Sequence, residues 1–405
     1  MNRRTVSILG AIGLVLAAGV LVGERANSER DAARPVGIEA NPLLPIDDNP
    51  RVRSTPSTTT TTEPPPPSFT LVAAGDVLLH TALVQQAQAD AAAAGRPGLE
   101  FTQMLAGVKN IVSAADVAVC HMETPMAPPG GPYSSYPVFS VPQEIGPALK
   151  ATGFDICSTG SNHTFDKGAD GVDRTLGALD AAGIRHAGSA RNPEEAGATT
   201  ILDVKGVKVA FLSYAYGFNG IPYPNGETWR ANIIDEGRIL GDARTAKQRG
   251  AEVVVVSLHW GTEYMHDPNA QQTALAPRLI ASPDVDLLLG HHAHVVQPVQ
   301  NVGGEWVVYG MGNMIANQTQ APREEGLLTR FTFTKVGSAW KVTDAAYEPL
   351  LTVHGIPIRL LAANSMLASP TTDPGLRPRL TEARDRTTGI VGSLGALQAG
   401  LHPID

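Results

Sequence analysis

The sequence predicts an α/β domain with a mixed β-sheet, and three observations lead to this prediction. From about residue 69 onward, short apolar runs rich in β-branched residues alternate with segments of helical pattern, as in α/β architectures. Two consecutive runs near the end, 327–337 and 339–350, have the pattern of an antiparallel hairpin. Several earlier runs end in a polar residue, at the position where α/β sheets bind their ligands.

These elements follow one another in a regular order. The strand-like runs before the hairpin are FTLVAAGD (69–76), DVAVCHMETP (116–125), FDICSTGSNH (154–163), KVAFLSYAYG (208–217), EVVVVSLHWG (252–261), VDLLLGHHAH (285–294) and WVVYGMGN (306–313). Helices are expected near 99–114, 142–152 and 171–182. Residues 69–355 are expected to form one domain, and residues 356–405 a C-terminal extension of loops and one weak helix.

The composition sets limits on the size and class of the protein. The chain has 405 residues, of which 43% are hydrophobic, so it can bury the core of one large domain or two modest ones. Its formal net charge is −8, and its lysines and arginines are dispersed. Nucleic-acid binding is not expected, because no basic stripe is present.

The N-terminus has the pattern of a targeting signal. Arg3 and Arg4 precede an apolar stretch over residues 7–22, which indicates a signal anchor or a cleavable signal peptide within residues 1–25. The remainder is therefore expected on the extracytoplasmic side of the cell membrane, or secreted if the signal is cleaved. Residues 26–68 include the tract TTTTTEPPPP and are expected to form a disordered Thr/Pro-rich linker.

Two cysteines, Cys120 and Cys157, are too few for a disulfide scaffold. Export permits one bridge between them, whereas their apolar surroundings suit buried free thiols equally well. The sequence leaves their pairing open.

Polar residues follow the apolar part of five strand-like runs. If these strands are parallel, residues far apart in the sequence converge beyond the carboxyl edge of the sheet. The residues at these ends are Asp76, Glu123, Asn162, His163, His259, His291, His292 and His294.

These residue types suit a divalent metal centre. Asp, Glu, Asn and neutral His together favour Zn²⁺, Mn²⁺ or Fe over an all-oxygen Ca²⁺ site. The number of candidate ligands suffices for one ion or for two ions about 3.5–4 Å apart. Water bound to such an ion becomes a nucleophile near neutral pH. The sequence contains no G-x-S-x-G elbow or P-loop that would support a rival mechanism.

Five motifs in order, AAGDVLLH, HMETP, SNHTFDKG, HWGTEY and GHHAHVVQ, resemble the bacterial capsule synthesis protein family CapA/PgsA. That family is associated with poly-γ-glutamate capsule synthesis, and its domain is related to the calcineurin-like metallophosphoesterases. The resemblance extends over roughly residues 69–349. It implies a metallophosphoesterase-like mixed β-sheet sandwich flanked by helices, and partners among the membrane proteins of an envelope-polymer synthesis complex.

The resemblance also implies roles for individual residues. Asp76 matches the first carboxylate ligand, and Glu123 stands where metallophosphoesterases place the bridging acid. Asn162 and His163 match the family's Asn-His pair, for which both catalytic and metal-ligand roles are expected. His259 matches the lone histidine ligand of a later strand.

The closing H-x-H motif is matched by His292 and His294. Because alternate residues of an extended chain point to the same side, His291 is expected to turn away from the metal. The opening D-x-H of the phosphoesterases is absent; whether His80 replaces its histidine, and whether His121 faces the same site, stay open. The number of bound metals stays open for the same reason.

Asp166, three residues after His163, either orients that imidazole or is an ordinary acid at a helix start. Trp260 is expected in the core.

Three functions follow from this sequence. The first is an exported, membrane-anchored protein in the synthesis or export of a poly-γ-glutamate-type capsule or another envelope polymer. The second is an extracellular metal-dependent phosphoesterase acting on envelope phosphates. The third is a non-enzymatic assembly partner of membrane synthesis proteins, so whether the chain is an enzyme stays open.

Overall fold

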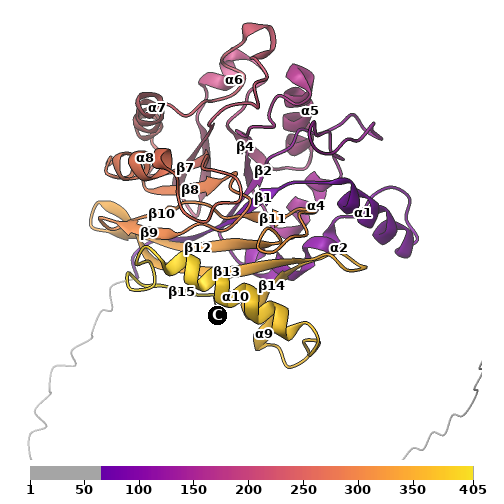
Figure 1. The fold of residues 1–405 in the computed structure, drawn as a ribbon. Coiled ribbons are helices and arrows are strands. Elements are labelled where there is room, and N and C mark those ends of the chain that lie inside the picture. The colour runs from indigo at the N-terminus through magenta and orange to yellow at the C-terminus, as the bar shows by residue number, and fades with distance from the viewer. Residues whose placement is uncertain (1–64, 405) are drawn as a thin grey trace, which may run out of the picture. The chain divides into compact units, whose positions relative to one another are not determined.

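The computed structural model describes residues 65–404. These residues form two β-sheets packed face to face, with helices on the outer faces (Figure 1). The predicted signal within residues 1–25, and residues 26–64 of the predicted linker, lie outside the described residues. Within residues 65–404, no helix combines the length and the apolar character that crossing a membrane requires.

The first sheet has a parallel half and an antiparallel half. Its strands are β1 (Ser68–Val77), β2 (Val117–Met122), β3 (Ile156–Ser158), β4 (Arg185–Ala187), β11 (Asn313–Ile315), β12 (Glu325–Val336), β13 (Ala339–Val353), β14 (Arg359–Ala362) and β15 (Leu401–Pro403). They follow the order β14-β13-β12-β1-β2-β3-β4, with β11 paired to β1 and β15 to β13. The half from β1 to β4 is parallel, and the half from β1 through β12 and β13 to β14 pairs in antiparallel fashion. Strands β12 and β13 form the predicted antiparallel hairpin.

The second sheet consists of β5 (Thr200–Val204), β6 (Val207–Ala215), β7 (Val253–His259), β8 (Leu287–His291), β9 (Val299–Val302) and β10 (Glu305–Val308). Its order is β5-β6-β7-β8-β10-β9. The four central strands pair in parallel, and both edge strands pair in antiparallel fashion. The carboxyl ends of β7 and β8 therefore lie at the same edge of this sheet.

Helices pack against both sheets. They are α1 (Thr81–Ala93), α2 (Thr102–Leu105), α3 (Lys109–Ser113), α4 (Ile145–Thr152), α5 (Gly168–Ala181), α6 (Pro193–Gly197), α7 (Glu236–Gln248), α8 (Ala270–Ile280), α9 (Ala363–Ala368) and α10 (Arg377–Gly392), with the 3₁₀ helices η1 (Ala106–Val108) and η2 (Pro224–Gly226). Residues of α1, α2 and α4 share an apolar core with the first sheet. Residues of α7 and α8 share one with the second sheet.

The middle of strand β1, residues 71–74, is apolar at every position because both of its faces are covered. Leu71 and Ala73 pack into the core between the sheets, whereas Val72 and Ala74 pack under the helices on the other face. Successive side chains of a strand point to opposite faces, so a strand covered on both faces needs apolar residues at every position. The predicted α/β sandwich of two mixed sheets flanked by helices is confirmed.

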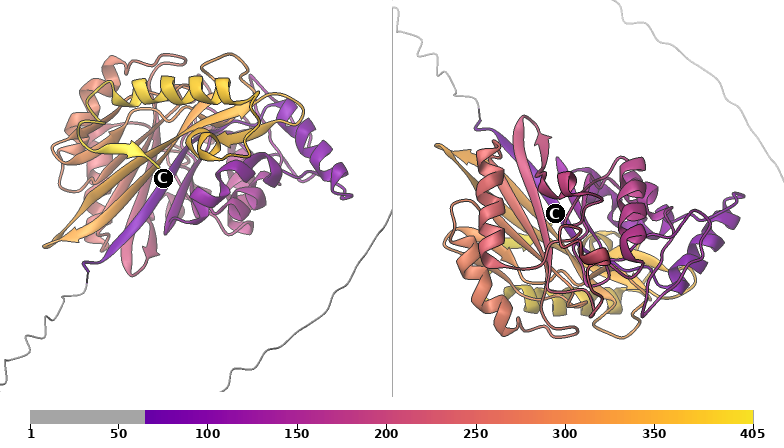
Figure 2. Two further views of the ribbon diagram at one scale, coloured as in Figure 1. Left: turned by 90° about the horizontal axis from the view of Figure 1, so that it is seen from below. Right: turned by 90° about the horizontal axis from the view of Figure 1, so that it is seen from above.

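The expected C-terminal extension is continuous with the fold. Both β14 and β15 pair with β13, and α10 lies along the same sheet (Figure 2), with Val391 in the core between the sheets. Residues 356–404 therefore belong to the sheet and are more than loops and one helix. Strands of four and three residues are too short to leave a periodic pattern in the sequence.

The two cysteines form a disulfide. Cys120 on β2 and Cys157 on β3 are directly opposed in the parallel register, and a bond joins their sulfur atoms. The pairing of β2 with β3 thereby answers whether the two cysteines are bonded, which the sequence left open.

Candidate metal centre

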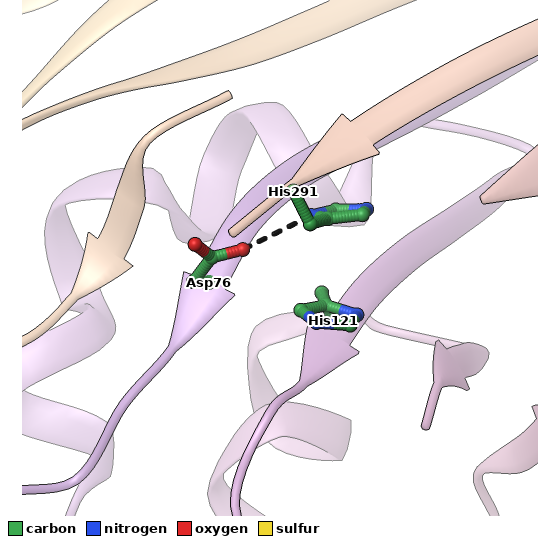
Figure 3. A group of neighbouring side chains, drawn as sticks. All are labelled: Asp76, His121 and His291. Atoms are coloured by element: carbon green, nitrogen blue, oxygen red, sulfur yellow. Dashed lines mark hydrogen bonds and ion pairs between the residues drawn. The ribbon is translucent and has the colours of Figure 1, made fainter. Parts of the chain in front are cut away.

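Three buried side chains from three strands meet at the carboxyl edge of the sheets. Asp76 lies near the end of β1, His121 on β2, and His291 at the end of β8, and one potential ligand atom from each lies within 4.8 Å of the others. The imidazole of His121 lies beside that of His291 (Figure 3). The two rings are stacked, with a centroid separation of 4.1 Å. Asp76 is fully buried, so its charge requires partners in the protein or a bound cation.

Two glycines allow the backbone to come close at this place. A Cβ atom on Gly75 would lie 2.0 Å from the carbonyl oxygen of Gly312, and one on Gly290 would lie 1.9 Å from that of Tyr309. Any larger residue would push the neighbouring backbone away. Each glycine directly precedes a site residue, Asp76 or His291, so these close approaches help to fix where their side chains begin.

The carboxylate of Asp76 has contacts on both oxygens. Its Oδ1 lies 3.1 Å from Nδ1 of His291, and its Oδ2 accepts a hydrogen bond of 3.2 Å from the backbone N–H of His292. The same Oδ2 lies 3.2 Å from Nδ1 of His294. Burial by itself raises the pKa of Asp76, but the hydrogen bonds of His291 and His294 outweigh it and lower this pKa well below its ordinary value. Asp76 is therefore an ionised carboxylate.

A second group places Asp76 with Glu123 and His294, again with ligand atoms within 4.8 Å. Nε2 of His294 lies 3.6 Å from Oε1 of Glu123. Burial raises the pKa of Glu123 to about 8. Burial lowers the pKa of His294, but the nearby Glu123 and Asp76 outweigh it and raise this pKa to about 9. Without a cation, Glu123 and His294 therefore hold at least one proton between them near neutral pH.

A third group consists of Glu263, His292 and His294. Glu263 is exposed and was not predicted as a ligand. It reaches the group because the chain reverses after β7, with Gly261 and Tyr264 in the left-handed backbone region. The motif HWGTEY contains an acid four residues after His259, but the sequence does not reveal this reversal.

His259 lies in a row of polar contacts. Its Nδ1 lies 2.9 Å from Nε2 of His121, and its Nε2 lies 2.9 Å from Oδ1 of Asn162. Burial lowers the pKa of His121 and of His259 well below the ordinary value. Both rings are therefore neutral near pH 7, which is the form that binds metal.

His163 is oriented by Asp166. Its Nδ1 lies 2.8 Å from Oδ2 of Asp166, which also accepts a hydrogen bond of 2.7 Å from the backbone N–H of Phe139. Burial lowers the pKa of His163, but the hydrogen bond to Asp166 and the charge of Glu123 outweigh it, so the pKa is raised overall. Asp166 is thus a positioning residue, in the turn that precedes α5.

The expectation that His291 turns away is wrong. Strand β8 ends at His291, and His292 and His294 adopt positive φ angles of 90° and 54°. The alternation of an extended chain therefore does not apply, and His291 faces Asp76. His80 belongs to none of the three groups, and its Nδ1 lies 3.1 Å from the carbonyl oxygen of Leu78.

The structure brings most of the predicted residues into one network of direct contacts. His163 joins it indirectly, because Oγ of Ser161 donates to the carbonyl of Glu123 and accepts from the backbone N–H of His163. The stacked rings of His121 and His291 join the two parts of this network, whose members are Asp76, His121, Glu123, Asn162, His259, His291, His292 and His294. Trp260 is buried in the core, as expected.

The donor set fits a divalent cation. Within the described residues, both carboxylate oxygens of Glu123, Nε2 of His291 and Nδ1 of His292 are buried without a hydrogen-bond partner. Such atoms are costly unless a partner satisfies them. Mixed imidazole and carboxylate donors suit Zn²⁺, Mn²⁺ or Fe. Asp76 belongs to two of the three groups, so the set accommodates one ion or two.

Two mixed sheets with a buried histidine and carboxylate centre at their carboxyl edge define an α/β sandwich with a candidate metal site. The chain belongs to the bacterial capsule synthesis protein family PGA_cap, whose family model matches residues 70–318. The resemblance drawn from the five motifs is thereby confirmed.

Several relatives of this chain are named for capsule or polymer synthesis. The capsule biosynthesis protein CapA of Bacillus anthracis is 28% identical over 203 residues, which are 49% of each chain. The PGA biosynthesis protein CapA of Bacillus subtilis (strain 168) is 28% identical over 197 residues, 47% of this chain and 50% of that protein. The chain thus spans about half the length of these relatives. A probable polyglutamine synthesis accessory protein of Mycobacterium tuberculosis is 26% identical over 293 residues, 69% of this chain and 74% of that protein.

Solved structures with some likeness include the calcineurin-like phosphoesterase YfkN from Bacillus subtilis, with a TM-score of 0.44 and 14% identity over 80% of this chain and 98% of that chain. A putative 5′-nucleotidase from Staphylococcus aureus has a TM-score of 0.47 and 14% identity over 78% of this chain and 58% of that chain. At TM-scores below 0.5, these likenesses add no argument about the site.

Proposed function

We propose that the chain is an exported, membrane-anchored protein that takes part in the synthesis or export of a poly-γ-glutamate-type envelope polymer, with a hydrolytic metal centre. The observation that carries this proposal is the convergence of Asp76, His121 and His291 in one buried group, in a chain of the capsule synthesis family. The names of its relatives in Bacillus support the polymer. Its partners are then the membrane proteins of the synthesis complex.

Two features support a location outside the cytoplasmic membrane. Arg3 and Arg4 precede the apolar stretch 7–22, and Cys120 is bonded to Cys157. Structural disulfides persist in oxidising compartments and are rare in the cytosol. Protease added to intact spheroplasts should degrade the domain while an N-terminal tag remains with the membrane. A domain that resists protease until the cells are lysed would contradict this location.

The residues of the centre have different roles in the proposed hydrolysis. A bound divalent ion would supply a Lewis acid that polarises the bond to be cleaved. Asp76 stays ionised and His121 stays neutral, so both members of the buried group are in the form that holds a cation. Asn162 fixes the ring of His259 through its amide oxygen.

His163 is the candidate proton donor. Asp166 binds its Nδ1 and favours the protonated ring, while its Nε2 makes no hydrogen bond to any of the residues described. The proton on Nε2 can therefore pass to the leaving group of a substrate. General acids of this kind contribute about 10²–10⁴-fold to a rate.

An activity assay of the full-length protein tests the proposal that the metal centre is hydrolytic. The protein, loaded with Mn²⁺ or Zn²⁺ in detergent, should cleave γ-linked glutamate oligomers or bis(p-nitrophenyl) phosphate, and His163→Ala should lose about 10²-fold or more. Asp170→Asn, an exposed change on α5, is the matched control and should keep full activity. Cleavage of the phosphate ester alone would favour the extracellular phosphoesterase. Absence of turnover with metal bound would refute hydrolysis and favour an assembly role.

A further inference from the structure

We propose that Arg323 binds an anionic group of the substrate, a carboxylate or a phosphate, beside the metal centre. The inference deepens the proposed function and rests on it, because it names the chemical class of the substrate. It follows from the position of Arg323, from the hydrogen bonds that hold its loop to His294, and from the absence of an acidic ion-pair partner among residues 65–404.

The guanidinium of Arg323 lies over the ring of a tyrosine next to the centre. Its Cζ atom is 3.6 Å from the ring centroid of Tyr264, and that ring is 6.1 Å from the ring of His294. The backbone N–H of Tyr264 donates a hydrogen bond of 2.7 Å to the carbonyl of Ala293, between two histidines of the centre. Tyr264 is 37% exposed, so the stacked pair lies where solvent has access to the rim of the site.

Hydrogen bonds connect the loop that carries Arg323 to His294. Nδ2 of Asn313 donates 2.8 Å to the carbonyl of Arg323, and Oδ1 of Asn313 lies 3.0 Å from Nδ1 of His294. Gln318 accepts from Asn313 at 3.0 Å and donates to the hydroxyl of Tyr264 at 3.4 Å. The position of Arg323 is therefore coupled to that of His294 through one polar side chain.

The guanidinium of Arg323 has no ion-pair partner among residues 65–404. The acids that follow it in sequence pair elsewhere, since Glu324 lies 2.7 Å and Glu325 lies 2.6 Å from Nη2 of Arg379 on α10. The pairing of Glu324 and Glu325 with α10 leaves Arg323 available for a ligand.

The chemistry of this arrangement selects oxyanions. A guanidinium is planar, always charged, and stacks on aromatic rings while its N–H groups point outward in the ring plane. That fork matches the two oxygens of a carboxylate or phosphate and gives charge-assisted hydrogen bonds. Arg323 therefore holds the anionic group next to the bond that the centre acts on.

Binding of two probes to the metal-loaded full-length protein tests the inference without turnover. Isothermal titration with tri-γ-glutamate and with inorganic phosphate measures Kd for each source of the anion. Arg323→Gln should weaken binding of the preferred probe about tenfold or more. Arg323→Lys should recover part of it, and Tyr264→Leu should weaken it because the platform is lost. Arg244→Gln is the matched control, since Arg244 pairs with Asp284 near the amino end of β8, and should leave Kd unchanged.

Three outcomes would overturn the inference: equal Kd values for the unmodified protein and Arg323→Gln, binding of neither probe, or loss of bound metal in Arg323→Gln. Preference for tri-γ-glutamate identifies a carboxylate polymer, and preference for phosphate identifies a phosphate ester. A protein that binds through Arg323 but cleaves nothing would refute the hydrolytic proposal and retain this inference. Cleavage of the substrate, together with probe binding that does not depend on Arg323, would refute this inference and retain the hydrolytic proposal.

Discussion

Oδ1 of Asp76 lies 3.1 Å from Nδ1 of His291, although 215 residues separate them along the chain. Asp76 belongs to β1 of the first sheet and His291 to β8 of the second. Their contact therefore joins the two sheets at the candidate metal centre. Since both side chains are buried, the centre exists only when the two sheets are packed together.

Replacing His291 should reduce metal binding. His291→Ala removes a member of the buried group with Asp76 and His121, so its metal content should fall as much as that of His294→Ala. Inductively coupled plasma mass spectrometry on purified protein measures this content. His186→Ala is the control, since His186 lies 3.2 Å from Asp180, outside the centre. Full metal content in His291→Ala would contradict its assignment as a ligand.

Asp166 should control the protonation of His163. In Asp166→Asn, the negative charge that raises the pKa of His163 is lost, so this pKa should fall and the protonated ring should persist only at lower pH. Titration of the imidazole Cε1–H signal by NMR measures the change. Asp170→Asn should leave the signal unaffected, and an unchanged titration in Asp166→Asn would show that Asp166 does not act on the ring.

Part of the centre was predictable because the end of an apolar strand can be recognised in the sequence by the polar residue that follows it. Asp76, Glu123 and His259 each follow such a run, and parallel strands bring their ends together. The orientation of His291 was not predictable, because it depends on left-handed backbone at His292 and His294. Positive φ angles are uncommon for residues other than glycine, and although histidine adopts them more often than most residues, the residue type alone does not predict them at these two positions.

Other features depend on pairing between distant segments. The disulfide requires that Cys120 oppose Cys157 in the register of β2 and β3, and a shift of one residue would separate them onto opposite faces. Strand β15 exists through its pairing with β13. Local sequence patterns do not contain this information.

Removing the disulfide should destabilise the fold. The double variant Cys120→Ala/Cys157→Ala loses a bond that closes a loop over a sequence separation of 37, and its free energy of unfolding should fall by about 2–4 kcal/mol. Urea unfolding measures the difference. The unmodified protein, unfolded in reductant, serves as the control and should match the variant. Equal free energies of unfolding for the oxidised protein and the variant would contradict the role of the bond.

Glu348 should make stability depend on pH. Its Oε1 accepts hydrogen bonds from the backbone N–H groups of Asn364 and Ser365 at 2.7 and 3.2 Å, and its Oε2 is buried without a partner. Burial raises its pKa from 4.5 to about 7. The folded state therefore binds the proton of Glu348 more tightly than the unfolded state does. The resulting contribution to the free energy of unfolding is complete below pH 4.5 and is lost as pH rises towards 7.

The variant Glu348→Gln tests this sign. The free energy of unfolding of the unmodified protein, minus that of Glu348→Gln, should decrease between pH 5 and pH 7, by at most about 3 kcal/mol. Urea unfolding at both pH values gives this difference. Glu194→Gln, an exposed change on α6, should show no such trend. A difference that stays constant or grows with pH would contradict the raised pKa.

The metal content of Asp76→Asn tests the central claim most directly, because Asp76 belongs to two of the three candidate ligand groups. The full-length protein, loaded with Mn²⁺ or Zn²⁺ and dialysed, should retain one or two ions per chain. Asp76→Asn should retain less than about a tenth of that amount, since it replaces a buried anionic donor with a neutral amide. Asp170→Asn should retain all of it. An unmodified protein that binds no ion, or an Asp76→Asn protein with full metal content and the native fold, would contradict the existence of this metal centre.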